Sequence, residues 1–554
     1  MARAQASVAA VATAVVAAFS LCGASCLERT LQVLDCQIDK DCPEGHACTG
    51  GGCLPKGTGA ATWAVELLPK AGSSWARTDS FPIAFAQDDA TLSAEPRASI
   101  AGRVQVGDPA KADSGAGARV IVSLPSLIPG RPDLQFEAES PAARAVNQAA
   151  FALSIPASAL GRFAAVRVIP SPPADESIPP FNLVDRLLSA SLVITFPSAA
   201  ELVQLDGTLV SAIGAPAPGF TARAFRRGAA VSTVKQTDAS GVFRLAAAPG
   251  QRSTELLGDM TIELHPADRL SGEPMLVTWP FSVLRSKSLG ELRLPAFSKP
   301  DIFRFQVAGR DGAMTPISGA SVRFRTVLDD AVGGTAVYRR EAITDAAGYV
   351  QVPLLSGIAD KAREYDVAVI PPSTSSFALR CIPRFAVTSG GGTGLTIQLS
   401  PKVGLRGRVY RSDGAPAAGV TILATRLAAD AGESCSGEAA ASPPVSTTTD
   451  STGYYQLRLD PGVHRLEHEP AKGAPMPRMT EEAVTVVDED TEHEVVLPPG
   501  GIVDGSAVGP DGSPLPSAEI RIYQILPSTA SLAGHTQSGA DGRFRVVLPF
   551  ASSR

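Results

Sequence analysis

One short stretch of the chain carries histidine and glutamate at a spacing used by zinc hydrolases. Residues 464–468 read His-Arg-Leu-Glu-His, and in the H-x-x-E-H pattern two histidines bind the metal from one turn of a helix. Here Pro461 precedes the stretch and Pro470 follows it, a context that predicts the return strand of a hairpin. In a strand, His464 and His468 share one face and the glutamate points to the other. No zinc site and no catalytic site are therefore expected at these residues.

Other residues that could do chemistry are few or wrongly spaced. The chain has six histidines among 554 residues, which argues against a histidine acid–base site. The sequence contains no G-x-S-x-G elbow, no P-loop and no EF-hand loop. The acidic tripeptide at residues 488–490 is interpreted as a solvated hairpin tip rather than a calcium site. The chain is therefore predicted not to be an enzyme and to need neither a cofactor nor a metal.

The overall composition favours several β-domains. At roughly 150 residues per domain, this length exceeds one compact core. The 51 Gly and 45 Pro residues, with only 5% aromatic residues, suit short strands joined by many turns. Lys and Arg number 49 against 55 Asp and Glu, a net charge of -6. Because this balance provides no basic surface, nucleic acid is not expected as a partner.

The amino terminus predicts export. Residues 8–21 form an apolar stretch behind Arg3, with the length of a signal-peptide core and too short to span a bilayer. The tetrapeptide Gly-Ala-Ser-Cys at residues 23–26 resembles the lipobox of bacterial lipoproteins, which implies lipidation of Cys26. Leu27 follows the cysteine, and the resemblance then implies the outer membrane or the cell surface. Ordinary cleavage to a soluble periplasmic or secreted protein is the alternative.

Four cysteines lie close together after this leader, at Cys36, Cys42, Cys48 and Cys53. The stretch is too short for a hydrophobic core, and an exported chain favours closure by two disulfides. Zinc held with His46 is the alternative, but the spacing lacks the C-x2-C element of common zinc sites. All three pairings of four cysteines stay open. The string CQIDKDCPEGHACTGGGC resembles the EGF-like or Dickkopf-like modules of myxobacterial surface proteins.

A pair of landmarks recurs with a period of about 100 residues, the size of one β-sandwich. The first is a strand followed by a turn that ends in Gly, and it begins at Gly102, Gly207, Phe305, Gly407 and Gly505. The second is a polar turn before an alternating strand, and it begins at Thr237, Thr344, Thr449 and Ser538. In this turn an Asp accepts backbone hydrogen bonds and a Gly adopts positive φ.

The landmarks resemble the carboxypeptidase regulatory-like domain, a transthyretin-like β-sandwich often repeated in bacterial envelope proteins. The fourth copy carries the motif residues Gly407, Val409, Asp413, Gly414, Pro416, Gly419, Val420, Ile422, Thr449, Asp450, Gly453, Tyr455, Pro461 and Gly462. In carboxypeptidases this sandwich accompanies the catalytic domain and performs no hydrolysis, so the resemblance implies no enzyme. The predicted fold is an all-β tandem array of antiparallel, transthyretin-like or Ig-like β-sandwiches.

The landmarks divide the chain into seven expected parts. These are a signal peptide at 1–25, a Cys-rich module at 26–60 and β-sandwiches at 61–200, 201–297, 298–401, 402–499 and 500–554. The fifth sandwich is expected to lack its last strands, either because the chain is a truncated version of a longer one or because an open edge awaits a donor strand. Cys381 and Cys435, near the third junction, are a candidate disulfide pair.

The leading functional interpretation is a non-enzymatic envelope lipoprotein that acts as a structural or interaction scaffold. Its expected partner is an envelope protein or a polysaccharide, with a lipid anchor as its only membrane contact. The alternatives are a carbohydrate-binding protein and an accessory subunit of a secreted hydrolase or transporter. Several aromatic side chains side by side on one exposed face would favour sugar binding, whereas aromatic side chains in the cores would favour a scaffold.

Overall fold

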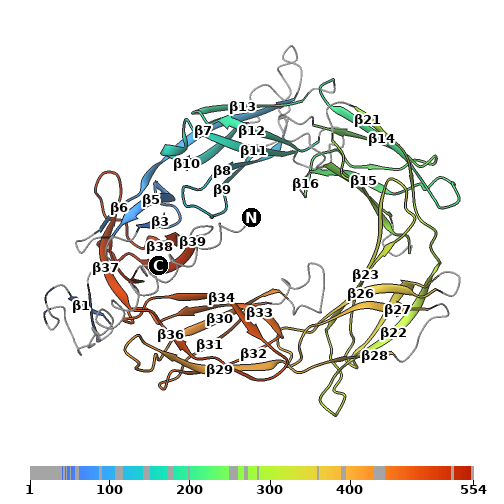
Figure 1. Ribbon diagram of the computed structural model, residues 1–554. Coiled ribbons are helices and arrows are strands. Elements are labelled where there is room, and N and C mark those ends of the chain that lie inside the picture. Colours follow the sequence, from blue (N-terminus) through green and yellow to red (C-terminus); the bar gives the residue numbers. More distant parts are fainter. Residues whose placement is uncertain are drawn as a thin grey trace, which may run out of the picture.

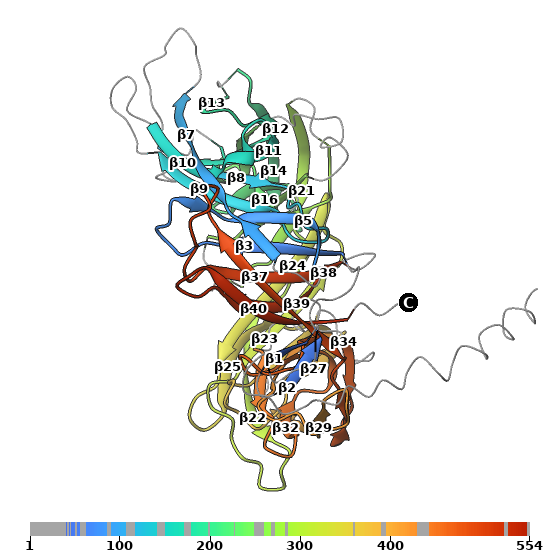
Figure 2. The same ribbon diagram turned by 90° about the vertical axis from the view of Figure 1, so that its left-hand side faces the viewer.

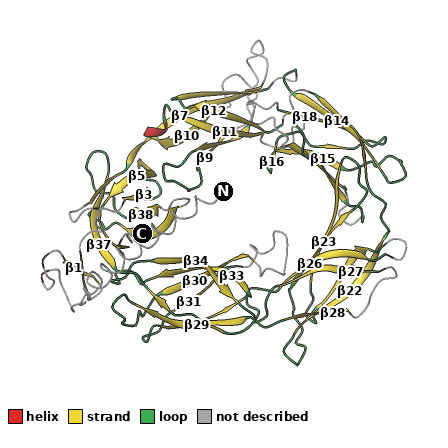
Figure 3. Cartoon of the chain, in the orientation of Figure 1, coloured by secondary structure: helices red, strands yellow, loops and turns green. Residues whose placement is uncertain are grey.

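The computed structural model describes residues 62–550 with internal gaps, and before them only residues 40, 44, 46–49 and 52–55. The gaps are 86–89, 107–116, 141–149, 171–178, 198–199, 227, 249–259, 268–271, 283–285, 358–360, 389–394, 429–442 and 526–529. The described residues are almost entirely strands and turns, and η3 (Ala157–Ala159) is a short 3₁₀ turn (Figure 3). The predicted all-β fold is confirmed. Five two-layered sandwiches follow one another around a ring (Figure 1).

Every sandwich has one sheet built around a central strand. The central strands, in order, are β7 (Glu95–Val106), β14 (Val203–Val210), β22 (Pro300–Gly309), β29 (Val403–Tyr410) and β37 (Gly500–Val508). Each pairs antiparallel with β10 (Ala150–Pro156), β18 (Val242–Ala247), β25 (Tyr349–Leu355), β32 (Tyr454–Leu459) and β40 (Arg543–Pro549), respectively. On its other side each pairs parallel with β13 (Ser191–Phe196), β21 (Lys287–Arg293), β28 (Leu395–Leu399), the pair β35 (Thr491–Glu492) and β36 (Val495–Val496), and β6 (Ala90–Ser93).

The second sheets pack against these across apolar cores. In the first sandwich the order is β12 (Phe181–Leu187), β11 (Phe163–Pro170), β8 (Ala118–Leu124), β9 (Leu134–Ser140). In the fourth it is β31 (Val445–Thr448), β30 (Thr421–Ala428), β33 (Gly462–Glu469), β34 (Met479–Val486). In β32, Tyr455, Leu457 and Leu459 are buried and the residues between them exposed. This alternation follows from the two-residue period of a strand and confirms the predicted core face.

The second and third sandwiches share one sheet. Its strands are β16 (Ala229–Ala230), β15 (Thr221–Arg226), β19 (Met260–His265), β20 (Met275–Thr278), β24 (Gly334–Ile343), β23 (Ser321–Leu328), β26 (Arg363–Ile370) and β27 (Arg380–Val387), with β17 (Lys235–Gln236) beside β15. The junction is the antiparallel pairing of β20 with β24, from Met275 opposite Val337 to Thr278 opposite Gly334. A Cβ at Gly334 would lie 2.3 Å from the carbonyl oxygen of Val277, so glycine permits this close approach. One continuous core serves both sandwiches.

The fifth sandwich is completed by strands from the other end of the described chain. We name β3 (Thr62–Leu68), β5 (Thr78–Ala84) and β6 the closing strands. β3 lies between β5 and β38 (Glu519–Ile525), beyond which lies β39 (Ala530–Gln537), and Figures 1 and 2 both show β3 beside β38. In each of the other four sandwiches, the strand parallel to the central strand is the last strand of the same repeat. In the fifth sandwich, β6 occupies this position beside β37.

Two expectations are therefore corrected. The described part of residues 500–554 holds only β37 to β40, as expected, but the fifth sandwich is not left incomplete. The closing strands supply the missing strands and share its core, which contains Trp63, Ile520 and Phe544. The first sandwich does not begin at residue 61, because its strands run from β7 to β13, and only the short β4 (Trp75–Ala76) joins it by pairing with β7. The ring is closed by pairing between strands more than 400 positions apart.

A buried carboxylate lies where the ring closes. Glu66 of β3 is 1% exposed and forms an ion pair with Arg77. Its Oε2 lies 3.6 Å from Arg521 of β38 and 3.9 Å from Arg131 of the first sandwich, and it accepts a 2.8 Å hydrogen bond from the phenol of Tyr523. A buried charge is stable only when it is paired and hydrogen-bonded. These contacts therefore favour the observed position of β3 beside β38 and the first sandwich.

The cysteine-rich region is described only in part. A hairpin of β1 (His46–Thr49) and β2 (Gly52–Pro55) places Cys48 opposite Cys53 in the backbone register. The predicted signal peptide, Cys26, Cys36, Cys42 and Cys435 lie outside the described residues. The lipidation and the disulfide pairings therefore stay predictions. In the part of the chain that is described, no helix combines the length and apolar character needed to cross a membrane.

Candidate functional site

The recurring polar turns are structural. The hydroxyl of Thr449 donates to the carbonyl of Ala417 at 2.7 Å and accepts from the backbone N–H of Val420 at 2.9 Å. Asp450 accepts a hydrogen bond from the backbone N–H of Thr452 at 2.8 Å and another from that of Tyr454 at 3.0 Å. The hydrogen bond from the Thr452 hydroxyl, and to a smaller extent these two backbone hydrogen bonds, lower the pKa of Asp450. Equivalent threonine or serine contacts are made by Thr237, Thr344 and Ser538. The recurring Thr, Ser and Asp side chains therefore stabilise the turns by hydrogen bonds to backbone groups.

The H-x-x-E-H residues do not converge. They lie on β33, where His464 and His468 are buried and Glu467 is half-buried on the other face, as the strand interpretation predicts. The Nε2 of His464 lies 2.8 Å from the carbonyl oxygen of Asp460, so this nitrogen carries the proton, since a carbonyl can only accept. Glu467 instead forms an ion pair with Arg478. The helical zinc geometry is absent from this strand.

A different histidine–carboxylate cluster forms in the fourth sandwich. The Nε2 atoms of His468 and His493 lie 2.8 Å and 3.1 Å from oxygens of Glu481, on β34. Burial acts to raise the pKa of Glu481, but the hydrogen bonds from His468 and His493 and their charge outweigh it and lower the pKa to about 2. The hydrogen bond to Glu481 raises the pKa of His493.

This cluster was missed from the sequence because its residues come from β33, β34 and the segment between β35 and β36, and no local spacing links them. His468 is 0% exposed, and the backbone carbonyl of His493 accepts from the phenol of Tyr455 at 2.8 Å. Since both imidazoles bind the same carboxylate, the cluster links β33 and β34 to the segment between β35 and β36. Among the described residues, no group of three or more histidine, cysteine or acidic side chains is arranged to hold a metal.

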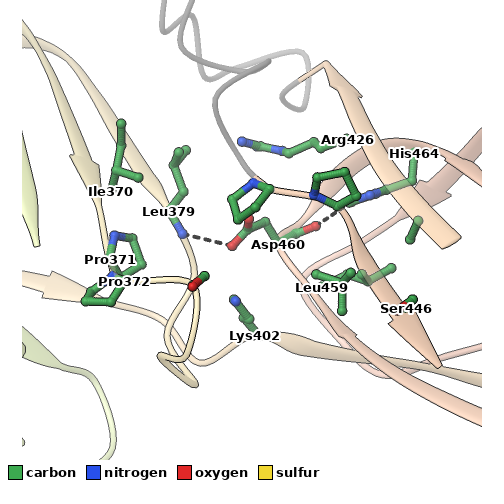
Figure 4. Close-up of a pocket in the computed structure, with 15 residues that line it drawn as sticks. Ile370, Pro371, Pro372, Leu379, Lys402, Arg426, Ser446, Leu459, Asp460 and His464 are labelled. Carbon is green, nitrogen blue, oxygen red and sulfur yellow. Dashed lines mark hydrogen bonds between the residues drawn. The ribbon is translucent and has the colours of Figure 1, made fainter. Parts of the chain in front are cut away.

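A pocket of about 260 Å³ lies between the third and fourth sandwiches (Figure 4). The Oδ1 atom of Asp460 accepts a 2.9 Å hydrogen bond from the backbone N–H of Leu379, so this side chain bridges the two sandwiches. Arg426 of β30 lies above Asp460 in the view and donates to the carbonyl of Pro461 at 2.9 Å. Lys402 also lines the pocket. The site therefore gathers charged groups at a domain junction, where ligand pockets commonly occur.

A larger cavity of about 520 Å³ lies among the fourth, fifth and first sandwiches. Its arginines have acidic or aromatic partners: Arg478 pairs with Glu467, Arg521 lies 2.7 Å from Glu519, and Arg131 lies 4.7 Å from the centre of the Tyr523 ring. Arg465 also lies 3.2 Å from Glu467. Because all four arginines on its walls already have acidic or aromatic partners, this cavity mainly joins the sandwiches.

Cys381 is disulfide-bonded. It lies on β27 of the third sandwich and is 4% exposed. Its predicted partner, Cys435, falls in the gap 429–442. The pairing therefore stays a prediction.

The described aromatic side chains are mostly in the cores. Those buried include Trp63, Tyr338, Tyr365, Tyr455 and Tyr523. The larger exposed rings belong to different sandwiches, with Phe163 in the first, Trp279 in the second and Tyr454 in the fourth. No exposed row of aromatic rings is found on one described face. This distribution favours a scaffold over sugar binding by an aromatic platform.

Comparisons with known proteins add little. No family model matches the chain, and no curated protein matches it. The resemblance to the carboxypeptidase regulatory-like domain therefore stays a prediction.

Among solved structures, the chain is similar to the Bacillus anthracis TIE protein, with 11% identity, 72% of this chain and 73% of that chain covered, and a TM-score of 0.16. It is similar to a streptococcal ancillary pilin, with 11% identity, coverage of 55% and 99%, and a TM-score of 0.20. For BcpA, the major pilin subunit of Bacillus cereus, the identity is 8%, the coverage 53% and 99%, and the TM-score 0.14. At these scores the similarities carry no argument about function.

Proposed function

We propose that the protein is a non-enzymatic scaffold of the bacterial cell envelope. The observation that carries this proposal is the closure of the ring, in which β3, β5 and β6 complete the fifth sandwich. Without those strands, β37 and β38 would each expose an edge, and open edges recruit other strands. Closure turns five sandwiches into one continuous body, a form suited to holding partners at fixed positions.

The continuous junctions support the same proposal. The second and third sandwiches share a sheet and a core, the third and fourth are bridged by Asp460, and the first and fifth meet around Glu66. A flexible tandem array would instead be joined by linkers with few contacts across them. The rims and faces of the ring are then the surfaces available to an envelope protein.

The leader supports an envelope location. The apolar stretch at residues 8–21 and the lipobox-like tetrapeptide that ends at Cys26 have the features of an exported lipoprotein. A single lipid at this position would attach the ring to the outer membrane or cell surface through its amino-terminal side. An open edge of the fifth sandwich would have favoured the accessory-subunit alternative through strand addition, and the closing strands fill that edge.

The experiment is a pull-down from solubilised cell envelopes, with the full chain carrying Cys26→Ser as bait, beside a glycan array probed with the same material. We call the core that the closing strands share with the fifth sandwich the closure core. Trp63→Ala, which removes a buried ring from the closure core, is compared with Trp279→Ala, which removes a ring that is 59% exposed. The proposal expects a defined protein partner, a blank array and weaker capture by Trp63→Ala alone. Specific glycan retention that is lost in Trp279→Ala would contradict it and support sugar binding.

A further inference from the structure

The pocket between the third and fourth sandwiches contains a buried cation with spare hydrogen-bond donors. Arg426 is 5% exposed. Its Nη2 donates to the carbonyl of Pro461 at 2.9 Å, whereas its Nε and Nη1 atoms have no hydrogen-bond partner. Among the described residues, no ion pair includes Arg426. Because a buried charge is costly unless it is paired and hydrogen-bonded, this guanidinium favours an anion beside it.

The other charged groups of the pocket leave an excess of positive charge. Lys402 lines the pocket along with Arg426, and Asp460 is the single carboxylate among the described lining residues. The Oδ1 atom of Asp460 already accepts the backbone N–H of Leu379. Two cations against one engaged carboxylate select a ligand with negative charge.

The remaining walls are largely apolar. Ile370, Pro371 and Pro372 line the pocket from the third sandwich, and Pro444, Val445 and Leu459 line it from the fourth. Apolar walls lower the local dielectric and strengthen an ion pair formed between them. The volume of about 260 Å³ lies below the roughly 300–1,000 Å³ of pockets for drug-sized ligands. The ligand is therefore small, with an apolar part.

We infer that this pocket binds a small carboxylate that carries a short apolar group. The carboxylate accepts hydrogen bonds from Nε and Nη1 of Arg426 and lies near Lys402, and the apolar group packs against the proline and aliphatic walls. Since Asp460 and Leu379 already join the two sandwiches here, the bound ligand also braces their junction. This site goes beyond the scaffold function and does not depend on the identity of a protein partner.

Isothermal titration calorimetry tests the site, with the full chain carrying Cys26→Ser as the protein. Isovalerate is the probe and isovaleramide its neutral control. We expect isovalerate to bind and the amide to bind at least about tenfold more weakly, since the charge-assisted hydrogen bonds are lost. Arg426→Gln is expected to weaken isovalerate binding about tenfold or more, and Lys402→Gln to weaken it by a smaller factor. Arg408→Gln, at an exposed position of the same sandwich outside the pocket, is expected to bind as the parent does.

A second variant tests the site independently, in case Arg426→Gln does not fold. Circular dichroism and the melting temperature show whether each variant is folded. Ser446→Trp lies at an exposed position of β31 that lines the pocket, so it fills the pocket and leaves Arg426 in place. We expect it to abolish isovalerate binding. The inference is overturned if isovalerate does not bind, if the amide binds equally well, or if folded Arg426→Gln or Ser446→Trp binds isovalerate as the parent does.

Discussion

The phenol of Tyr523 donates a 2.8 Å hydrogen bond to the carboxylate of Glu66, although 457 positions separate the two residues. Both side chains are almost fully buried. Burial, and then the hydrogen bond and charge of Glu66, raise the pKa of Tyr523 to about 12, so the phenol stays protonated and remains a donor at neutral pH. This contact fixes the register of β3 against β38, and with it the closure of the ring.

Replacing Tyr523 by Phe should loosen the closure without changing its shape. The variant leaves one oxygen of a buried carboxylate without its phenol donor, and hydrogen bonds to charged groups contribute about 2 kcal/mol. Urea unfolding followed by tryptophan fluorescence reports on this region, because Trp63 lies in the closure core. Tyr454→Phe, at a side chain that is 37% exposed, is the matched control and should change the midpoint little. Equal shifts in the two variants would show that the contact does not stabilise the closure.

Trp63→Ala should open the fifth sandwich locally. Removing a fully buried Trp from a core costs about 3–5 kcal/mol, and its neighbours in that core come from β38 and β40. Hydrogen exchange is expected to accelerate in residues 500–549 and to stay unchanged in the second and third sandwiches. Trp279→Ala, at the exposed Trp of the second sandwich, should leave residues 500–549 protected. Unchanged exchange there in Trp63→Ala would mean that the closing strands are dispensable.

The fourth sandwich should lose stability as the pH rises above neutrality. The folded-state pKa of His493 is raised above its ordinary value of 6.5 by the hydrogen bond to Glu481. Protonated His493 therefore stabilises the folded state fully below that ordinary value, and the stabilisation is lost as the pH rises through the folded-state pKa. Glu481 has its pKa lowered, so its contribution is present above its ordinary pKa of 4.5 and is lost only as the pH falls toward 2.

Glu481→Gln checks this pH dependence. At pH 6 the variant should be less stable than the parent by about 2 kcal/mol, and its stability should vary less between pH 6 and pH 8.5. Glu482→Gln, at the exposed neighbouring position, keeps the parent's pH profile. Denaturant unfolding at the two pH values is the measurement, and a parent stability that increases toward pH 8.5 would contradict the assigned role of His493.

Cys26→Ser should release the protein from membranes. The lipobox-like tetrapeptide makes Cys26 the expected lipid attachment residue, and a serine cannot form the thioether. Fractionation of cells should find the parent chain in the membrane pellet and the variant in the soluble envelope or medium. Cys22→Ser, four positions earlier within the expected signal peptide, is the control and should stay in the pellet. Retention of Cys26→Ser in the pellet would rule out the lipid anchor.

Local features of the sandwiches could be predicted from the sequence because they depend on neighbours in the chain. The alternation through Tyr455, Leu457 and Leu459 follows from the period of a strand. Gly453 has φ of 74° and Asp450 accepts backbone hydrogen bonds within its turn, as the polar-turn pattern indicates. The prolines on either side of residues 464–468 also indicated that this stretch is a strand and not a zinc-binding helix.

Long-range features could not be predicted in this way. Leu67 lies opposite Ile520, but a strand's own pattern records which face is buried and not which strand lies beside it. The same limit applies to the candidate sites. Glu481 of β34 lies beside His468 of β33 and His493, which lies between β35 and β36, and Arg426 and Lys402 line one pocket at the junction of two sandwiches. Closure of the ring therefore had to be seen in three dimensions.

Cross-linking across the closure tests the central claim most directly. Leu68 and Glu519 are register partners in β3 and β38, whereas Gln524 lies opposite Trp63 at the far end of the pairing. Facing Cα atoms of antiparallel strands are about 4.5–5.5 Å apart, within the range of a disulfide. Oxidation of the Leu68→Cys, Glu519→Cys chain should give a monomeric species that migrates faster on non-reducing gels, and the Leu68→Cys, Gln524→Cys chain should not. No cross-link with either pair, or a cross-linked dimer, would contradict closure of the ring within one chain.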